Sequence, residues 1–153
     1  MNAGGQLGVI AAISFIAAGG TLWIKGPPNR WFRCDSATLK PDEICLDAIS
    51  RGGDVVWVDA RSRADWEKNG KAGSLLWNLD PLENIQAFEA ALAARIVETP
   101  RVIVYCGDEN CGISRQIAAC IRGLDLGAEV SVLRGGWRAL SEADRLQRES
   151  PRP

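Results

Sequence analysis

The sequence contains no histidine among its 153 residues. This absence excludes Ser-His-Asp triads, Cys-His dyads, His-ligated zinc or haem, and imidazole general bases. Any chemistry must come from cysteine, carboxylates, Arg and Lys side chains, or the backbone. A basic surplus is also absent, because 18 Lys and Arg residues stand against 19 Asp and Glu residues, a formal net charge of −1. Since binding to a phosphate backbone needs positive charge, no nucleic-acid partner is expected.

Cysteine is scarce, with five residues and therefore an odd number. That content is far below that of a disulfide scaffold, and the length is that of one domain with a sizeable core. No Cys-x-x-Cys pair occurs, which argues against zinc knuckles and the thioredoxin-type redox motif. We therefore expect no metal and no cofactor.

Charge is missing from residues 2–24, and the apolar stretch 7–24 contains only Ser14 and Thr21 as polar side chains. Eighteen helical residues span roughly 27 Å, close to the ~30 Å hydrocarbon core of a bilayer. The stretch predicts a single transmembrane helix that ends before Pro27. A cleaved signal peptide or a buried soluble helix is the alternative, although the segment before residue 7 lacks the usual basic residues.

Basic residues follow the apolar stretch, and none precedes it. The positive-inside rule then places the globular part in the cytoplasm, with a periplasmic or other extracytoplasmic location as the alternative. We expect four regions along the chain: a membrane anchor at 1–25, a juxtamembrane linker at 26–42, a globular domain at 43–143 and a polar C-terminal tail at 144–153.

Short β-branched runs alternate with helical patterns in the globular region. Buried strands separated by helices predict an α/β fold, with a mostly parallel central sheet and helices on both faces. The expected strands are residues 55–58, 75–77, 101–105 and 130–133, and the expected helices are residues 84–97 and 113–126.

A cysteine directly follows the apolar strand 101–105. Ligands bind outside the carboxyl ends of parallel strands, so Cys106 lies at the ligand-binding edge of the predicted sheet. A glycine-bearing loop comes next, and a helix begins near Ser114. Backbone N–H groups and the helix dipole would then point at the Cys106 sulfur and stabilise a thiolate or a persulfide. This anion cradle comprises Gly107, Asp108, Glu109, Asn110, Gly112, Ile113 and Ser114.

Three motifs in this order resemble the rhodanese-like (sulfurtransferase) domain family over about residues 43–143. They are Asp59-Ala60-Arg61 followed by Trp66-Glu67, the Cys106 loop with Ser114, and Arg134-Gly135-Gly136-Trp137. The resemblance implies a cysteine nucleophile that accepts a sulfane sulfur from a small donor and passes it to a thiol or a protein acceptor. It implies no cofactor.

The chain departs from the family pattern at two places. The usual Gly-His-Ile stretch is replaced by Gly70-Lys71-Ala72-Gly73-Ser74. The loop is longer than usual, with eight residues from Cys106 through Ile113, and is similar to that of a rhodanese subset whose loop carries a second cysteine, here Cys111. Asp108 and Glu109 oppose thiolate formation and repel anions, which argues against thiosulfate as the natural donor.

The cysteines have different expected roles. Cys106 is the candidate catalytic nucleophile. Cys111 is either a loop residue without chemistry or a resolving thiol that closes a disulfide with Cys106. Because a cradle points N–H groups inward and side chains outward, we expect the two thiols to be separate at rest. We expect Cys120 in the core and assign no role to Cys34 or Cys45.

Asp59 and Arg61 leave a strand at the same edge as the Cys106 loop. They are expected to form a structural ion pair, with direct binding of an anionic substrate by Arg61 as the alternative. Cysteine phosphatases need an arginine six residues after the cysteine, a position taken by Gly112. Three functions therefore stay open: a membrane-anchored sulfurtransferase, a Cys106/Cys111 thiol-disulfide redox protein, and a non-catalytic module that docks a partner protein at the membrane.

Overall fold

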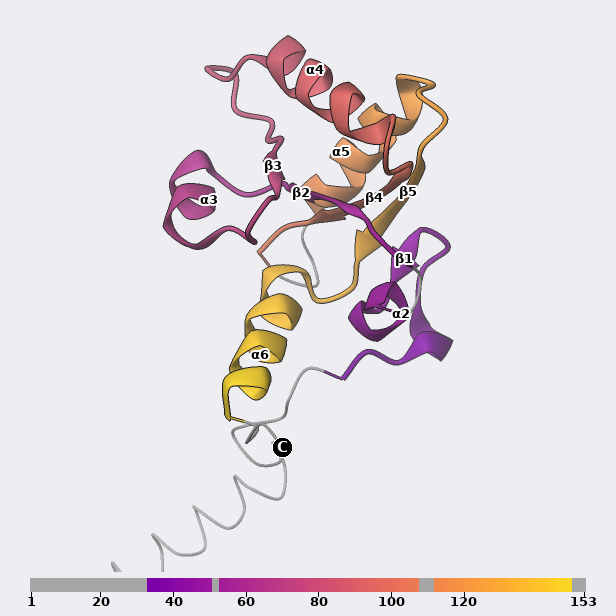
Figure 1. Cartoon of the computed structure of the whole chain (residues 1–153), viewed down its shortest axis with the longest axis vertical. Helices are drawn as coiled ribbons and strands as arrows, with labels where there is room; N and C mark the ends of the chain where they lie inside the picture. Colours follow the sequence, from indigo (N-terminus) through magenta and orange to yellow (C-terminus); the bar gives the residue numbers. More distant parts are fainter. Residues whose placement is uncertain (1–32, 51–52, 108–111, 150–153) are drawn as a thin grey trace, which may run out of the picture. The chain divides into compact units, whose positions relative to one another are not determined.

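The computed structural model describes residues 33–50, 53–107 and 112–149. Five parallel strands form one sheet in the order β1-β5-β4-β2-β3 (Figure 1). This arrangement confirms the predicted α/β fold with a parallel sheet. The strands are β1 (Glu43–Ile44), β2 (Val56–Asp59), β3 (Leu75–Leu76), β4 (Arg101–Tyr105) and β5 (Glu129–Leu133).

Helices separate the strands, as expected for parallel connections. Serine and asparagine fix two helix starts, because the Ser62 side chain accepts from the Asp65 N–H and the Asn84 side chain accepts from the Ala87 N–H. The helices are the 3-10 turn η1 (Ser36–Thr38), α2 (Leu46–Ser50), α3 (Arg63–Asn69), α4 (Ile85–Ile96), α5 (Gly112–Gly123) and α6 (Gly136–Glu149).

The central strand β4 supplies core residues to both faces of the sheet, because successive side chains alternate. Val102 and Val104 pack in a cluster with residues of α4 and α5. Ile103 and Tyr105 pack in a second cluster, which includes Ile49 of α2 and Leu140 of α6. Cys106 continues the first series, so its side chain lies on the α4–α5 side of the sheet.

Two expected boundaries differ from the observed ones by more than one residue. The helix predicted at 113–126 begins at Gly112 and ends at Gly123, followed by Asp125 in the left-handed region with φ 51°. Helix α6 continues to Glu149, so the first residues of the expected polar tail are helical. Its polar residues repeat with helical spacing beside Ala139 and Leu140, which are buried.

The expected anchor at residues 7–24 lies outside the described residues. Among the helices that the structure does describe, none is both long and apolar enough to cross a bilayer.

Candidate functional site

Cys106 follows the last residue of the central strand β4, and its side chain is buried, with 2% of its surface exposed. Its Sγ atom lies 3.5 Å from Oγ of Ser114, a buried residue in the first turn of α5. Its carbonyl oxygen accepts a hydrogen bond of 2.6 Å from the backbone N–H of Trp137. The thiol position is therefore held from β4, from α5 and from the start of α6.

The start of α6 reaches Cys106 through a tight turn. Gly135 and Gly136 have φ values of 83° and 51°, a region that residues with a side chain rarely adopt. This turn lets the chain leave β5 and immediately present the N–H of Trp137 to Cys106. The Gly-Gly-aromatic motif thus braces the candidate nucleophile from a neighbouring strand.

The Cys106 loop is described only at its two ends. Gly107 is exposed, and Gly112 and Ile113 form the exposed start of α5, ahead of the buried Ser114. Asp108, Glu109, Asn110 and Cys111 lie outside the described residues.

Cys106 is disulfide-bonded, so the expectation of a free thiol at rest is wrong for this residue. Cys34 and Cys45 are bonded to each other, and Cys120 is free. Loop geometry by itself does not determine whether a thiol is reduced or oxidised, because that depends on the reduction potential of the pair and on its surroundings. A sulfur atom in a disulfide bond is not a thiolate, so Cys106 must be reduced before it can act as a nucleophile.

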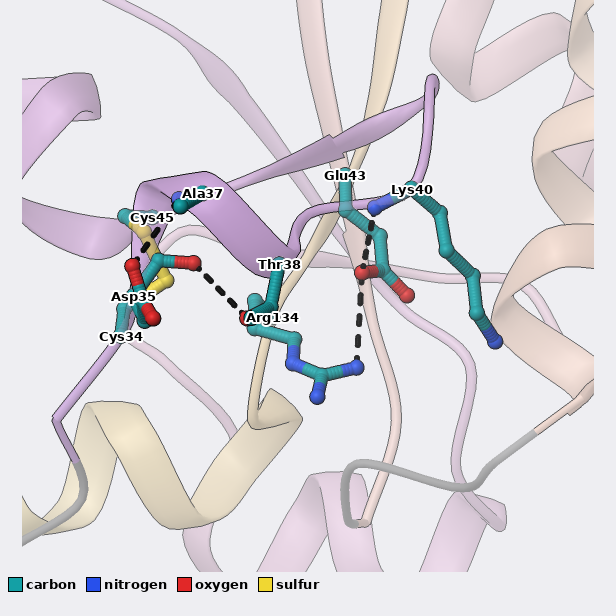
Figure 2. Close-up of a disulfide and its surroundings, with 8 residues drawn as sticks. All are labelled: Cys34, Asp35, Ala37, Thr38, Lys40, Glu43, Cys45 and Arg134. Carbon is teal, nitrogen blue, oxygen red and sulfur yellow. Dashed lines mark hydrogen bonds and ion pairs between the residues drawn. A yellow bond between two sulfur atoms is a disulfide. The ribbon is translucent and has the colours of Figure 1, made fainter.

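A second disulfide joins Cys34 to Cys45, with 5.7 Å between their Cα atoms (Figure 2). Cys45 follows β1 and is 4% exposed, and Cys34 lies just before η1. Sequence reasoning assigned these residues no role, because the overall cysteine content is low. Their separation of 11 residues across the Pro41-Asp42 turn was the signal available. Cys120, expected in the core, is exposed on α5.

Asp59 and Arg61 form a salt bridge with 2.8 Å between Arg61 Nη2 and Asp59 Oδ2. Arg61 Nε also donates to Asp59, and Nη1 donates to Asn69 Oδ1 at 2.9 Å. The guanidinium stacks over the Trp137 ring at 4.4 Å. These contacts occupy the Arg61 donors and support its structural role over substrate binding.

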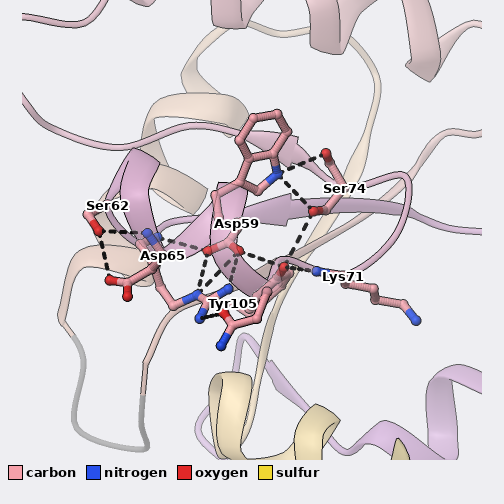
Figure 3. A network of polar contacts seen from close by, with 9 residues as sticks. Asp59, Ser62, Asp65, Lys71, Ser74 and Tyr105 are labelled. Atoms are coloured by element: carbon pink, nitrogen blue, oxygen red, sulfur yellow. Dashed lines mark hydrogen bonds and ion pairs between the residues drawn. The ribbon is translucent and has the colours of Figure 1, made fainter.

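Tyr105 completes this network from β4 (Figure 3). Its hydroxyl donates to Asp59 Oδ2 at 2.7 Å and accepts from the backbone N–H of Lys71 at 3.0 Å. Burial raises the pKa of Tyr105 to about 12, and the nearby Asp59 carboxylate adds to that effect. Burial by itself lowers the pKa of Arg61, but hydrogen bonding to Asp59 and its charge outweigh burial, so the pKa is raised. Sequence reasoning had treated Tyr105 only as a strand residue.

Among the described residues, no group of three Cys, Asp or Glu side chains is arranged to hold a metal ion.

The comparison with protein families identifies the class of protein. The rhodanese-like domain family matches residues 44–143, two-thirds of the chain. The chain belongs to the rhodanese-like domain family.

No curated protein matches the sequence. Among solved structures, the chain is similar to the BH2092 protein from Bacillus halodurans, with 19% identity over 66% of this chain and 72% of that one, and a TM-score of 0.49. It is also similar to the N-terminal domain of a protein from Clostridium difficile 630, with 16% identity over 66% of this chain and 97% of that one, and a TM-score of 0.48.

Proposed function

We propose that this chain is a membrane-anchored sulfurtransferase that carries a sulfane sulfur as a persulfide on Cys106. The observation that supports this most is the position of Cys106, at the end of the central parallel strand and against the first turn of α5. That is where ligands of parallel α/β sheets bind and where a helix N-terminus favours an anionic sulfur. Membership in the rhodanese-like domain family supports the same chemistry.

The reaction begins from the reduced protein. Two equivalents of a small thiol reduce the Cys106 disulfide, and the thiols leave as their own disulfide. The Cys106 thiolate then attacks the outer sulfur of a persulfide donor, the donor's S–S bond breaks, and its thiolate leaves. Attack by an acceptor thiolate on the outer sulfur of Cys106 regenerates the cysteine thiolate.

We propose Cys111 as the disulfide partner of Cys106, because the other three cysteines of the sequence are accounted for. The bonded state of Cys106 also supports a second candidate function, a thiol-disulfide redox protein that uses the same pair. A non-catalytic module that docks a partner at the membrane is the third. The acidic residues Asp108 and Glu109 disfavour thiosulfate as the donor in the first case.

The Cys34–Cys45 disulfide favours an oxidising compartment for the globular domain. Such bonds persist in secreted and periplasmic proteins and are rare in a reducing cytosol. We therefore propose that the globular domain lies outside the cytoplasm. The basic residues after residue 24 indicate the opposite orientation, but their excess is modest. Alkylation of intact cells with a membrane-impermeant thiol reagent that labels the exposed Cys120 tests this choice, with a cytoplasmic protein as the unlabelled control.

Intact mass spectrometry separates the candidate functions. The protein is reduced, freed of reductant and incubated with a polysulfide, with 3-mercaptopyruvate or with thiosulfate. We expect a gain of the mass of one sulfur atom with the first two donors, mapped to Cys106 and absent in Cys106→Ser. Cys120→Ser is the matched control and should gain the sulfur. Loss of two hydrogen masses without sulfur gain supports the redox protein, and an unchanged mass supports the docking module.

A further inference from the structure

A buried carboxylate between two arginines lies at the carboxyl edge of the sheet. The Glu43 side chain is 2% exposed, and its Oε1 atom lies 3.5 Å from Arg115 Nη1. Its Oε2 atom lies 3.4 Å from Arg134 Nη1 and accepts from the backbone N–H of Lys40 at 3.1 Å (Figure 2). We call Glu43, Arg115 and Arg134 the arginine clamp.

The register of the sheet places the clamp at the same edge as Cys106. Val104 of β4 pairs with Val132 of β5, so Cys106 and Arg134 each come two residues after a paired position on adjacent strands. Arg115 comes directly after Ser114, whose hydroxyl lies 3.5 Å from the Cys106 sulfur. The two arginines therefore reach the same edge of the sheet as the candidate nucleophile.

Arg115 is the most exposed member of the clamp. Its side chain is 33% exposed, whereas the Glu43 side chain is 2% exposed. Within the described residues, the polar contact of Arg115 is a single ion pair of 3.5 Å, which leaves most of its five N–H donors for a ligand. Arg61 differs, because its donors are held by Asp59 and Asn69.

The clamp is separated from the reacting sulfur. Glu43 belongs to β1, which lies two strands away from β4, or roughly 10 Å at the usual strand spacing. Thiosulfate carries its negative charge on the transferred sulfur itself and on oxygens only two bonds from it, and so suits this separation poorly. A donor whose charge lies several bonds from its sulfane sulfur fits better.

We propose that Arg115, held in place by Glu43, binds the carboxylate of a small alkyl persulfide donor while Cys106 attacks its outer sulfur. The inference rests on the proposed sulfur transfer, to which it adds the donor class and its binding residue. A guanidinium matches a carboxylate with two parallel N–H···O bonds, which fixes orientation as well as charge. Arg115 takes no part in the covalent step. In that step the bond between Cys106 and the outer sulfur forms, the donor's S–S bond breaks, and the donor's thiolate leaves.

The test compares two donors that differ in one charge, on reduced full-length protein. The donors are the persulfide of N-acetylcysteine and the persulfide of its neutral amide. Arg115→Gln should raise KM for the carboxylate donor about tenfold or more, as expected for one charge-assisted hydrogen-bonding group, and leave kcat within about twofold. With the amide donor it should change neither constant.

Arg122→Gln is the matched control, because Arg122 also lies on α5 and pairs with an acid beside β1, Asp42, at 3.8 Å. It should leave both donors unaffected. Equal effects of Arg115→Gln on the two donors, or no effect on either, would overturn the inference.

A binding measurement keeps this result separate from the proposed function. S-methylated N-acetylcysteine cannot transfer sulfur, and its affinity for the protein is followed by NMR titration. Binding that weakens about tenfold in Arg115→Gln supports the role of the clamp. If the wild type binds this compound but shows no sulfur transfer with the persulfide donors, only the proposed function fails. Binding that is equal in wild type and variant overturns the clamp whether or not sulfur is transferred.

Discussion

Arg61 links three parts of the chain through one planar side chain. It pairs with the fully buried Asp59, reaches Asn69 at the end of α3, and stacks over Trp137 at the start of α6. Because Trp137 donates its backbone N–H to Cys106, the packing of Arg61 bears on the candidate nucleophile. Asp59 would be left as an uncompensated buried charge without this partner.

Replacing Arg61 by alanine should therefore cost about 3–5 kcal/mol of unfolding free energy, as for other broken buried pairs. The control is Arg63→Ala, because Arg63 Nη2 lies 2.6 Å from Glu83 Oε2 in an exposed pair that solvent screens, and its loss should cost far less. Urea unfolding followed by tryptophan fluorescence measures both values. Similar losses in the two variants would contradict the structural role of Arg61.

Tyr105 predicts a loss of stability at alkaline pH. Its folded-state pKa of about 12 lies above the ordinary value near 10, so the unfolded chain releases this proton first as pH rises. Protonated Tyr105 therefore adds on the order of 2–3 kcal/mol to the free energy of unfolding. This stabilisation is fully present below pH 10 and is lost between about pH 10 and 12.

The chain has one tyrosine, so tyrosinate absorbance reports Tyr105 alone. Titration of the folded protein should show ionisation near pH 12, and Tyr105→Phe should lack this alkaline slope of stability. Ionisation of the native protein near pH 10 would count against the buried network.

At the scale of elements, the edge strand β1 is held by more than its two residues of pairing with β5. The Cys34–Cys45 disulfide ties the segment before η1 to the end of β1, and Glu43 ties the strand to α5 and to the residue after β5. A short edge strand with so few ladder bonds needs such additional links.

Breaking the Cys34–Cys45 bond should destabilise the domain by about 2–3 kcal/mol, since the closed loop is short. The double variant Cys34→Ser/Cys45→Ser is compared with Cys120→Ser, which removes the free, exposed cysteine of α5. We expect a lower urea midpoint only for the double variant. Equal midpoints would mean that the bond adds little to the native domain.

At the scale of the whole molecule, the family match and the described core both begin near β1. Residues 44–143 match the rhodanese-like domain, and the apolar segment 7–24 lies well before them. Anchoring and folding should therefore be separable.

A chain that starts at residue 33, and so keeps Cys34, should be folded and soluble without detergent. The full-length chain should float with lipid vesicles on a density gradient, while the truncated chain stays at the bottom. An insoluble truncated chain, or a full-length chain that does not associate with vesicles, would contradict the proposed anchor.

The sequence by itself determined the parallel α/β fold and the placement of Cys106 at its ligand-binding edge. Alternation of β-branched runs with helical spacing is a local signal, and a residue that follows a buried parallel strand must lie at that edge. The Asp59–Arg61 pair was also predictable, because the two residues are neighbours in the chain.

Only the tertiary structure decided the Cys34–Cys45 bond, the oxidised state of Cys106, and the contacts of Tyr105 and Glu43. Each depends on where separate strands and helices come together, as when β5 and α5 bring Arg134 and Arg115 to the Glu43 carboxylate. Such long-range distances leave no periodic signal in the sequence, because they are set by strand order and helix packing rather than by spacing along the chain.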